Sequence, residues 1–163
     1  MNVTDTNSNR FAFSTINWGN YMINYPYKIA IVEDNEVELN MIKQIVSKDN
    51  RFEVLEFSNP IEAFDAIEKE EVRVIFTDLQ MEALNGEELL SKVNELQRGV
   101  ICFVMTGTSN YITANSCLNA GVRNILLKPI RPQTIRESLN EAASHLERWQ
   151  NIIMEVLEKK KAG

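Results

Sequence analysis

The chain has 163 residues, 44% of them hydrophobic and 25% charged, which is enough to bury a core without disulfides or structural metals. Its formal net charge of −6 argues against a nucleic-acid surface, which requires concentrated basic side chains. No apolar run approaches the roughly 20 residues that span a bilayer, and Cys102 and Cys117 lack metal-ligand spacing. We therefore expect a cytoplasmic protein with neither a nucleic-acid nor a membrane partner.

Residues 1–27 differ in composition from the rest of the chain. They show no helical or alternating pattern, and they contain six asparagines and six aromatic residues. Two interpretations stay open for this N-terminal extension. It is either a leader without stable structure, or a segment that docks partly on the domain or on a partner chain.

From residue 28 onward, predicted strands and helices alternate. Runs of β-branched and aromatic residues predict strands at residues 28–32, 52–57, 72–78, 100–105 and 124–127. Helix signals between them are a start near Asn35, an Asn59 cap followed by Pro60, a start at Gly86, and a stop at Gly121. We expect the first two helices to direct these apolar residues inward: Val37, Leu39, Ile42, Ile45, Val46, Ile61, Phe64 and Ile67.

Five strand-helix units with short loops predict a doubly wound α/β domain around a five-stranded parallel sheet. Ligands of such sheets bind beyond the carboxyl ends of the strands. Polar residues occur at these ends in this chain: Glu33, Asp34, Asp78, Thr106 and Lys128. Clustered carboxylates suit a hard cation such as Mg²⁺, and a lysine with a hydroxyl supplies the donors that a phosphoryl group needs.

The last predicted element is a single helix from Thr134 to about Lys161. Its apolar residues repeat at alternating spacings of four and three, which is typical of a heptad seam. The helix would be roughly 40 Å long, more than one small sheet requires. We expect residues 146–163 to continue the helix as a coiled coil, with a homodimer seam at Leu139, Leu146, Trp149, Ile153 and Val156. The alternative is a helix that covers its own domain and frays after Trp149.

Over about residues 28–145 the chain resembles the receiver domains of two-component response regulators. The resemblance rests on four motifs in the family's order: Glu33-Asp34, Asp78 with Met81 and Gly86 after it, Thr106-Gly107, and Lys128-Pro129. It implies a flavodoxin-like sheet with strand order 2-1-3-4-5. It also implies that a histidine kinase or a histidine phosphotransfer protein donates a phosphoryl group to Asp78.

The same resemblance implies a role for each site residue. Asp34, Asp78 and the backbone carbonyl of Gln80 would bind Mg²⁺ directly, and Glu33 would act through water. Lys128 and Thr106 would contact phosphoryl oxygens, and a cis peptide bond would precede Pro129.

The chain departs from the family pattern at positions that modulate the reaction. Glu82 replaces the proline that usually follows the methionine, and Ile125 replaces the usual aromatic switch residue. The side chains of Gln80 and Thr108 flank the expected path of an attacking water. We therefore expect Thr108, Ile125 and Glu82 to tune the lifetime or the output of the phosphorylated state.

Other functions remain as alternatives. The chain could be a receiver fragment of a hybrid kinase or an effector-linked regulator, whose coiled coil continues to an output domain. A haloacid-dehalogenase-type phosphohydrolase normally needs an acid two residues after the nucleophile, where Gln80 stands. His145, the only histidine, is expected to be a solvated helix residue, which makes a Ser-His-Asp hydrolase improbable. We expect no enzymatic activity beyond the chain's own phosphorylation and dephosphorylation.

Overall fold

The structure is a computed structural model that describes residues 25–81, 86–108 and 110–161. Five strands and five helices alternate along the described chain. In order they are β1 (Tyr27–Val32), α1 (Glu36–Val46), β2 (Phe52–Phe57), α2 (Pro60–Lys69), β3 (Val72–Asp78), α3 (Gly86–Glu95), β4 (Ile101–Thr106), α4 (Tyr111–Asn119), β5 (Asn124–Leu127) and α5 (Pro132–Lys161). All strand pairs are parallel, in the order β2-β1-β3-β4-β5, which confirms the predicted sheet.

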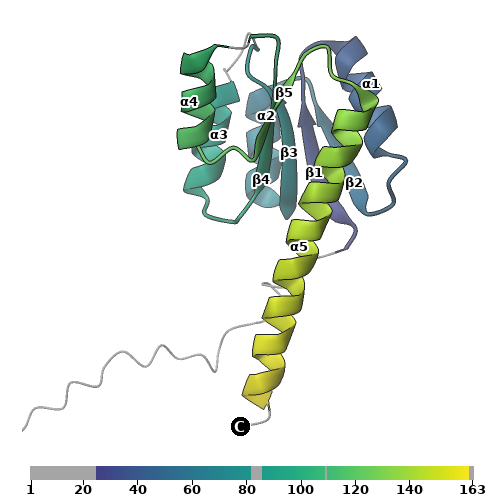
Figure 1. Cartoon of the computed structure of the whole chain (residues 1–163), viewed down its shortest axis with the longest axis vertical. Coiled ribbons are helices and arrows are strands. Elements are labelled where there is room, and N and C mark those ends of the chain that lie inside the picture. The colour runs from purple at the N-terminus through teal and green to yellow at the C-terminus, as the bar shows by residue number, and fades with distance from the viewer. Residues whose placement is uncertain (1–24, 82–85, 109, 162–163) are drawn as a thin grey trace, which may run out of the picture.

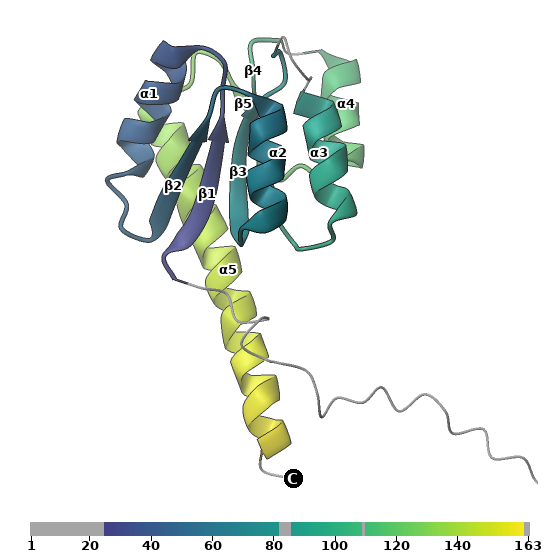
Figure 2. The same ribbon diagram turned by 180° about the vertical axis from the view of Figure 1, so that it is seen from behind.

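The sheet lies between two layers of helices. Helices α1 and α5 cover one face, and α2, α3 and α4 cover the other (Figures 1 and 2). Strands β3 and β4 are buried along almost their whole length because both faces are covered, which explains their nearly continuous apolar sequences. Two apolar cores result, one on each side of the sheet.

The predicted helix boundaries are confirmed at the level of hydrogen bonds. The Asn35 side chain accepts hydrogen bonds from the N–H groups of Val37 and Glu38, and the Asn59 side chain accepts one from Ile61 N–H. Gly121 follows α4 with a φ of +72°, a left-handed conformation that glycine adopts without strain. The Val122 N–H then donates to the Cys117 carbonyl, which closes the helix.

Three predictions about burial and boundaries are wrong. Val37 is 78% exposed and Ile61 is 52% exposed, so neither faces the core. Helical periodicity explains Val37, because a residue two positions before the buried Leu39 lies on nearly the opposite side of α1. Strand β1 begins at Tyr27, one residue before the predicted start, and the Tyr27 side chain is buried. Most of the predicted N-terminal extension, residues 1–24, lies outside the described residues.

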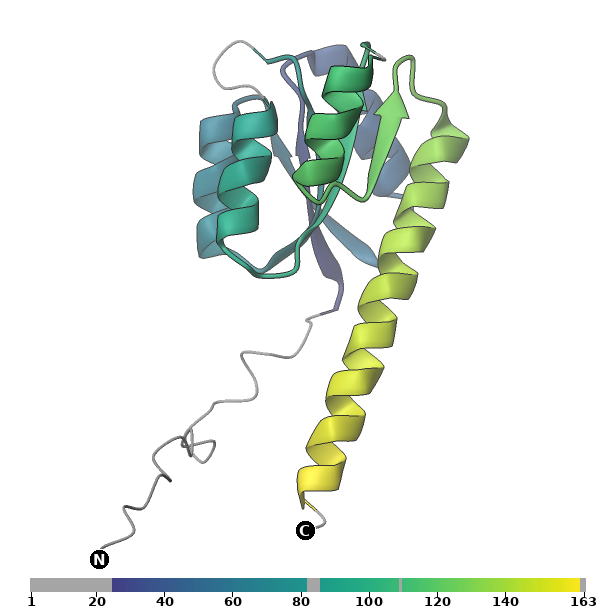
Figure 3. The same ribbon diagram turned by 60° about the vertical axis from the view of Figure 1, so that its left-hand side comes forward.

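Helix α5 has 30 residues, about 45 Å at 1.5 Å per residue, and its C-terminal half extends beyond the sheet (Figure 3). The first half packs against the domain and buries Leu139 and Leu146 in the same core as α1. These two residues therefore cannot form part of a dimer seam, which corrects the prediction. Trp149 and Val156, farther along, are exposed, and Ile153 is partly exposed.

Within the described residues, no helix combines the length and the apolar character needed to cross a membrane.

Candidate functional site

The predicted site residues come together at the carboxyl edge of the sheet. Glu33 and Asp34 follow β1, Asp78 ends β3, Thr106 ends β4, and Lys128 follows β5. Backbone pairing holds these ends in register: Leu79 N–H donates to the Met105 carbonyl, and Lys128 N–H donates to the Thr106 carbonyl. Parallel strands thus place side chains from distant parts of the sequence beside one another.

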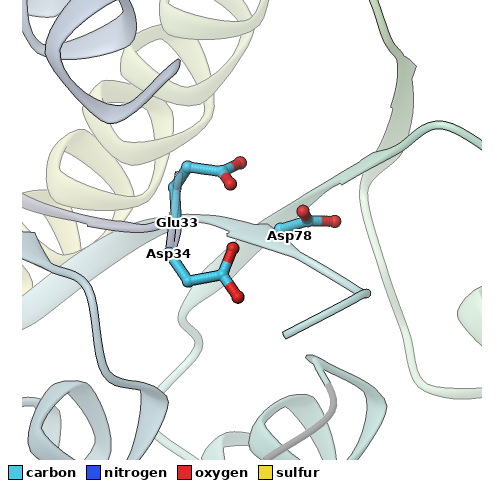
Figure 4. A group of neighbouring side chains, drawn as sticks. All are labelled: Glu33, Asp34 and Asp78. Carbon is cyan, nitrogen blue, oxygen red and sulfur yellow. The ribbon is translucent and has the colours of Figure 1, made fainter. Parts of the chain in front are cut away.

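Three carboxylates form the acidic part of the site. Glu33, Asp34 and Asp78 each offer an oxygen within 4.8 Å of the others, and Figure 4 shows their side chains grouped at the ends of β1 and β3. Glu33 and Asp78 are buried, whereas Asp34 is exposed. A set of oxygen ligands with one solvent-facing member fits Mg²⁺, because this ion prefers oxygen donors and keeps several of its waters.

Lys128 supplies the positive charge at the centre of the site. Its Nζ lies 2.7 Å from Asp78 Oδ2, 2.8 Å from Glu33 Oε2 and 2.6 Å from Glu38 Oε2. Burial alone would lower the pKa of Lys128, but the hydrogen bonds to Asp78, Glu33 and Glu38 outweigh burial and raise it. The ammonium therefore stays charged. The Lys128-Pro129 peptide bond is cis, as the resemblance implied.

The two buried carboxylates have different surroundings. Burial raises the pKa of Glu33, the neighbouring charge of Asp78 adds to this effect, and hydrogen bonds from Lys128 and from Asn35 N–H oppose it. Asp78 accepts hydrogen bonds from Lys128 on Oδ2 and from Gln80 N–H on Oδ1. One amide and one ammonium thus fix the orientation of the Asp78 carboxylate.

The sequence interpretation missed Glu38. It lies in the first turn of α1, where a glutamate three residues after an N-cap usually bonds back to the cap's N–H group. Here Glu33 Oε1 accepts that bond from Asn35 N–H at 3.1 Å, and Glu38 turns to Lys128 instead. The sequence contained one signal for this contact: Glu38 stands at the N3 position of α1, and Glu33, at the end of the preceding strand, can take its usual place at the cap.

A second hydrogen-bonded group lies beside Asp78. The Gln80 side-chain amide donates to Thr108 Oγ1 at 3.1 Å, and Thr108 N–H donates to Thr106 Oγ1 at 3.1 Å. Thr106 is buried and Gln80 is exposed. The residues predicted to flank the attacking water are therefore linked directly to each other and to the threonine at the end of β4.

Ile125 is partly buried and packs against the core on the side of the sheet that α2, α3 and α4 cover. It lines an apolar groove of about 340 Å³ together with Tyr111, Ala114, Leu127 and Thr108. Thr108 thus borders both this groove and the hydrogen-bonded group beside Asp78. Glu82, the other predicted modulator, lies outside the described residues.

Gly86 packs against the backbone that carries Asp78. Its N–H donates to the Leu79 carbonyl at 3.0 Å, and a Cβ at this position would lie 2.8 Å from Leu79 Cα and collide with the Asp78 carbonyl. Only glycine allows the start of α3 to approach the end of β3 this closely.

Comparison with known proteins gives a consistent result. The family model of the response regulator receiver domain matches residues 29–140. A chemotaxis protein CheY homolog of Campylobacter jejuni is 35% identical over 120 residues, which cover 70% of this chain and 90% of that protein. Chemotaxis protein CheY1 of Helicobacter pylori is 32% identical over 118 residues, which cover 69% and 93%.

A solved structure has the same fold. A CheY-like response regulator receiver domain protein from Methanospirillum hungatei superposes with a TM-score of 0.71 at 28% identity. The match covers 75% of this chain and 97% of that one.

Proposed function

This chain belongs to the response regulator receiver domain family, and from that premise we propose that Asp78 accepts a phosphoryl group in a two-component or phosphorelay system. The donor is a histidine kinase or a histidine phosphotransfer protein, and the chain acts in the cytoplasm. The observation that carries the proposal is the contact of Lys128 with both Asp78 and Glu33, beside the exposed Asp34.

The proposed reaction is covalent catalysis by a carboxylate. An Asp78 oxygen forms a bond to phosphorus while the bond from phosphorus to the donor's histidine nitrogen breaks. Lys128 and the Thr106 hydroxyl stabilise charge on the phosphoryl oxygens by donating hydrogen bonds to them. The chain accepts and releases the phosphoryl group only on its own Asp78, and we expect no other enzymatic activity.

Mg²⁺ is the cofactor in this proposal. Asp34, Asp78 and the Gln80 carbonyl would bind it directly, and Glu33 would bind through water. When bound, the ion offsets the repulsion between an anionic donor and the acidic cluster. Two observations support this assignment: Glu33, Asp34 and Asp78 each offer an oxygen within 4.8 Å of the others, and Asp34 is exposed to solvent.

The proposed output is a homodimer formed by the second half of α5. Trp149, Ile152 and Val156 are exposed there, and Ile153 and Leu157 are partly exposed. These five residues, which we call the distal stripe, follow helical spacing and continue the alternating pattern beyond the buried half. Among the described residues, this half of α5 protrudes from the domain (Figure 3), and a second copy of the same stripe would cover its apolar side chains.

Labelling with a small phosphodonor tests the site. The protein is incubated with acetyl phosphate and Mg²⁺ and examined by intact mass spectrometry. We expect one added phosphoryl group in the wild type and in Asp65→Asn, which changes an exposed aspartate of α2, and none in Asp78→Asn. Undiminished labelling of Asp78→Asn would overturn the assignment.

A further inference from the structure

The face of α5 that packs on the domain continues past the edge of the domain. Leu146 is buried in the core that α5 shares with α1. Gln150, Ile153 and Leu157 follow it at spacings of four, three and four, which keeps them on the same face of the helix. All three are partly exposed. Two apolar side chains of this face, Ile153 and Leu157, thus lie on the half of α5 that protrudes from the described domain (Figure 3).

The start of β1 lies beside the same face of α5. The Tyr27 hydroxyl donates a hydrogen bond to Gln150 Oε1 at 3.5 Å. The Tyr25 ring is exposed and stands edge-to-face on the Tyr27 ring, with the two centroids 5.6 Å apart. Figure 2 shows this end of β1 at the level where α5 leaves the sheet. The residues that precede Tyr25 are therefore tethered at the base of the protruding half of the helix.

The composition of residues 11–24 favours burial. These residues lie outside the described part of the chain, and their sequence has no charged side chain. Eight of them are apolar: Phe11, Ala12, Phe13, Ile16, Trp18, Tyr21, Met22 and Ile23. Segments that stay unfolded typically combine low hydrophobicity with high net charge, and this segment has neither property. We therefore expect it to bury its aromatic side chains against an apolar surface.

The protruding half of α5 is within reach of this segment. Fourteen extended residues span about 46 Å at 3.3 Å per residue, whereas α5 from Gln150 to Lys161 is about 17 Å long. A second apolar surface, the groove beside Ile125, is lined by Thr108 and Leu127 at the carboxyl edge of the sheet. The start of β1 is at the opposite edge, so the tether favours α5. Tethering also gives an effective concentration of about a millimolar, at which a few apolar contacts suffice.

We propose that residues 11–24 dock on the protruding half of α5 in the same chain, along the face formed by Gln150, Ile153 and Leu157. The apolar side chains of this segment cover Ile153 and Leu157 and continue the contact that Tyr27 begins. In the homodimer of the proposed function, on which this second part of the inference rests, a second copy covers Ile153 and Leu157 as well. The segment and the second copy therefore compete, and the segment weakens self-association.

Tryptophan fluorescence tests the docking in the full chain. The chain has two tryptophans, so in Trp149→Phe the emission comes from Trp18 alone. At submicromolar protein we expect this emission to be blue-shifted from that of N-acetyltryptophanamide, and to stay constant over a tenfold range of protein concentration. Adding Ile153→Asp should abolish the shift, because a carboxylate on this face loses its hydration when the segment docks. Asn151→Asp adds the same charge at an exposed position outside the distal stripe and should keep the shift.

Sedimentation tests the competition. Phe13→Ser/Trp18→Ser removes two aromatic side chains from the segment and leaves α5 unchanged. We expect the dissociation constant of its dimer to be lower than that of the wild type by about threefold or more, since a competing contact is lost. Val3→Ser changes an apolar residue outside residues 11–24 and should dimerise like the wild type.

The outcomes separate the docking from the proposed function. Trp18 emission equal to that of the free amide would overturn the docking. A blue shift that persists in Ile153→Asp would overturn α5 as its site, and a shift that grows with protein concentration would assign the contact to a second copy. Equal dimer dissociation constants in the wild type and Phe13→Ser/Trp18→Ser would overturn the competition. If both proteins are monomeric at tens of micromolar, the proposed homodimer is refuted, whereas the fluorescence result still decides the docking.

Discussion

At the scale of single residues, burial of the Glu33 carboxylate lowers the stability of the fold, although the same carboxylate forms part of the proposed site. Burial raises its pKa, so above its ordinary value of 4.5 the folded protein binds more protons than the unfolded chain does. The free energy of unfolding therefore falls as pH rises from 4.5 through the raised pKa. The ion pair with Lys128 offsets part of this penalty and holds both groups at the site.

Replacement of Glu33 by glutamine should remove this pH dependence. Glutamine carries no charge to desolvate, so we expect the stability of Glu33→Gln relative to the wild type to increase from about pH 5 to about pH 7. Urea denaturation in metal-free buffer measures it. Glu53→Gln, at an exposed position on β2, is the control and should track the wild type. If the curves of Glu33→Gln and the wild type run parallel with pH, burial of Glu33 is not the cause.

Asp34 allows a separate test of the metal site. Because it is the exposed member of the cluster, Asp34→Ala should fold normally and lose about tenfold or more in Mg²⁺ affinity. Mg²⁺ binding followed by NMR chemical shifts reports the change. Glu36→Ala removes an exposed carboxylate two residues away and should bind Mg²⁺ like the wild type. Normal Mg²⁺ affinity in Asp34→Ala would exclude Asp34 as a ligand.

At the scale of elements, the two halves of α5 should respond differently to truncation of a side chain. Leu146 is buried in the core shared with α1, so Leu146→Ala should lower the free energy of unfolding by about 2–5 kcal/mol. Val156 is 52% exposed, and Val156→Ala should cost less than about 0.5 kcal/mol in the monomer. Urea denaturation at low protein concentration compares them. Equal costs would mean that the domain boundary in α5 is misplaced.

The elements that the sequence predicted best are those whose signals are local. Asn59 with Pro60 marked the start of α2, and Gly121 marked the end of α4, because caps and left-handed turns depend on neighbouring residues only. The heptad spacing also predicted the long helix α5. A periodic pattern does not, however, indicate whether the apolar side chains pack against their own domain or against a second copy. Leu139 and Leu146 face their own sheet, and that is decided by tertiary packing.

The same distinction explains the site. Residues at strand ends were predicted because parallel topology brings those ends together. Glu38 was missed because its contact with Lys128 joins residues 90 positions apart and depends on Glu33 having taken the Asn35 N–H group. Such a choice between two hydrogen-bond partners is a property of the folded site, and local sequence patterns do not contain it.

At the scale of the whole molecule, Lys128 lies close to both helices of one layer. Glu38 is in the first turn of α1, and α5 begins four residues after Lys128. Helices α1 and α5 lie side by side on the same face of the sheet (Figures 1 and 2). In the proposed function, Lys128 changes partner when Asp78 is phosphorylated. This change would occur near the start of the helix whose far end carries the distal stripe, so phosphorylation would have a physical route to the proposed association surface.

The distal stripe itself can be tested by charge insertion. Ile153→Asp/Val156→Asp places two carboxylates in the stripe but leaves the buried half of α5 unchanged, so we expect a folded monomer that still accepts phosphate from acetyl phosphate. Sedimentation at tens of micromolar should show a dimer for the wild type and for Asn151→Asp, which adds a charge at an exposed position outside the stripe. Because an aspartate in an apolar interface must lose its hydration without gaining a partner, the double variant should lose association entirely. A wild type that is monomeric at this concentration, with and without beryllofluoride, would show that a second copy does not cover the stripe.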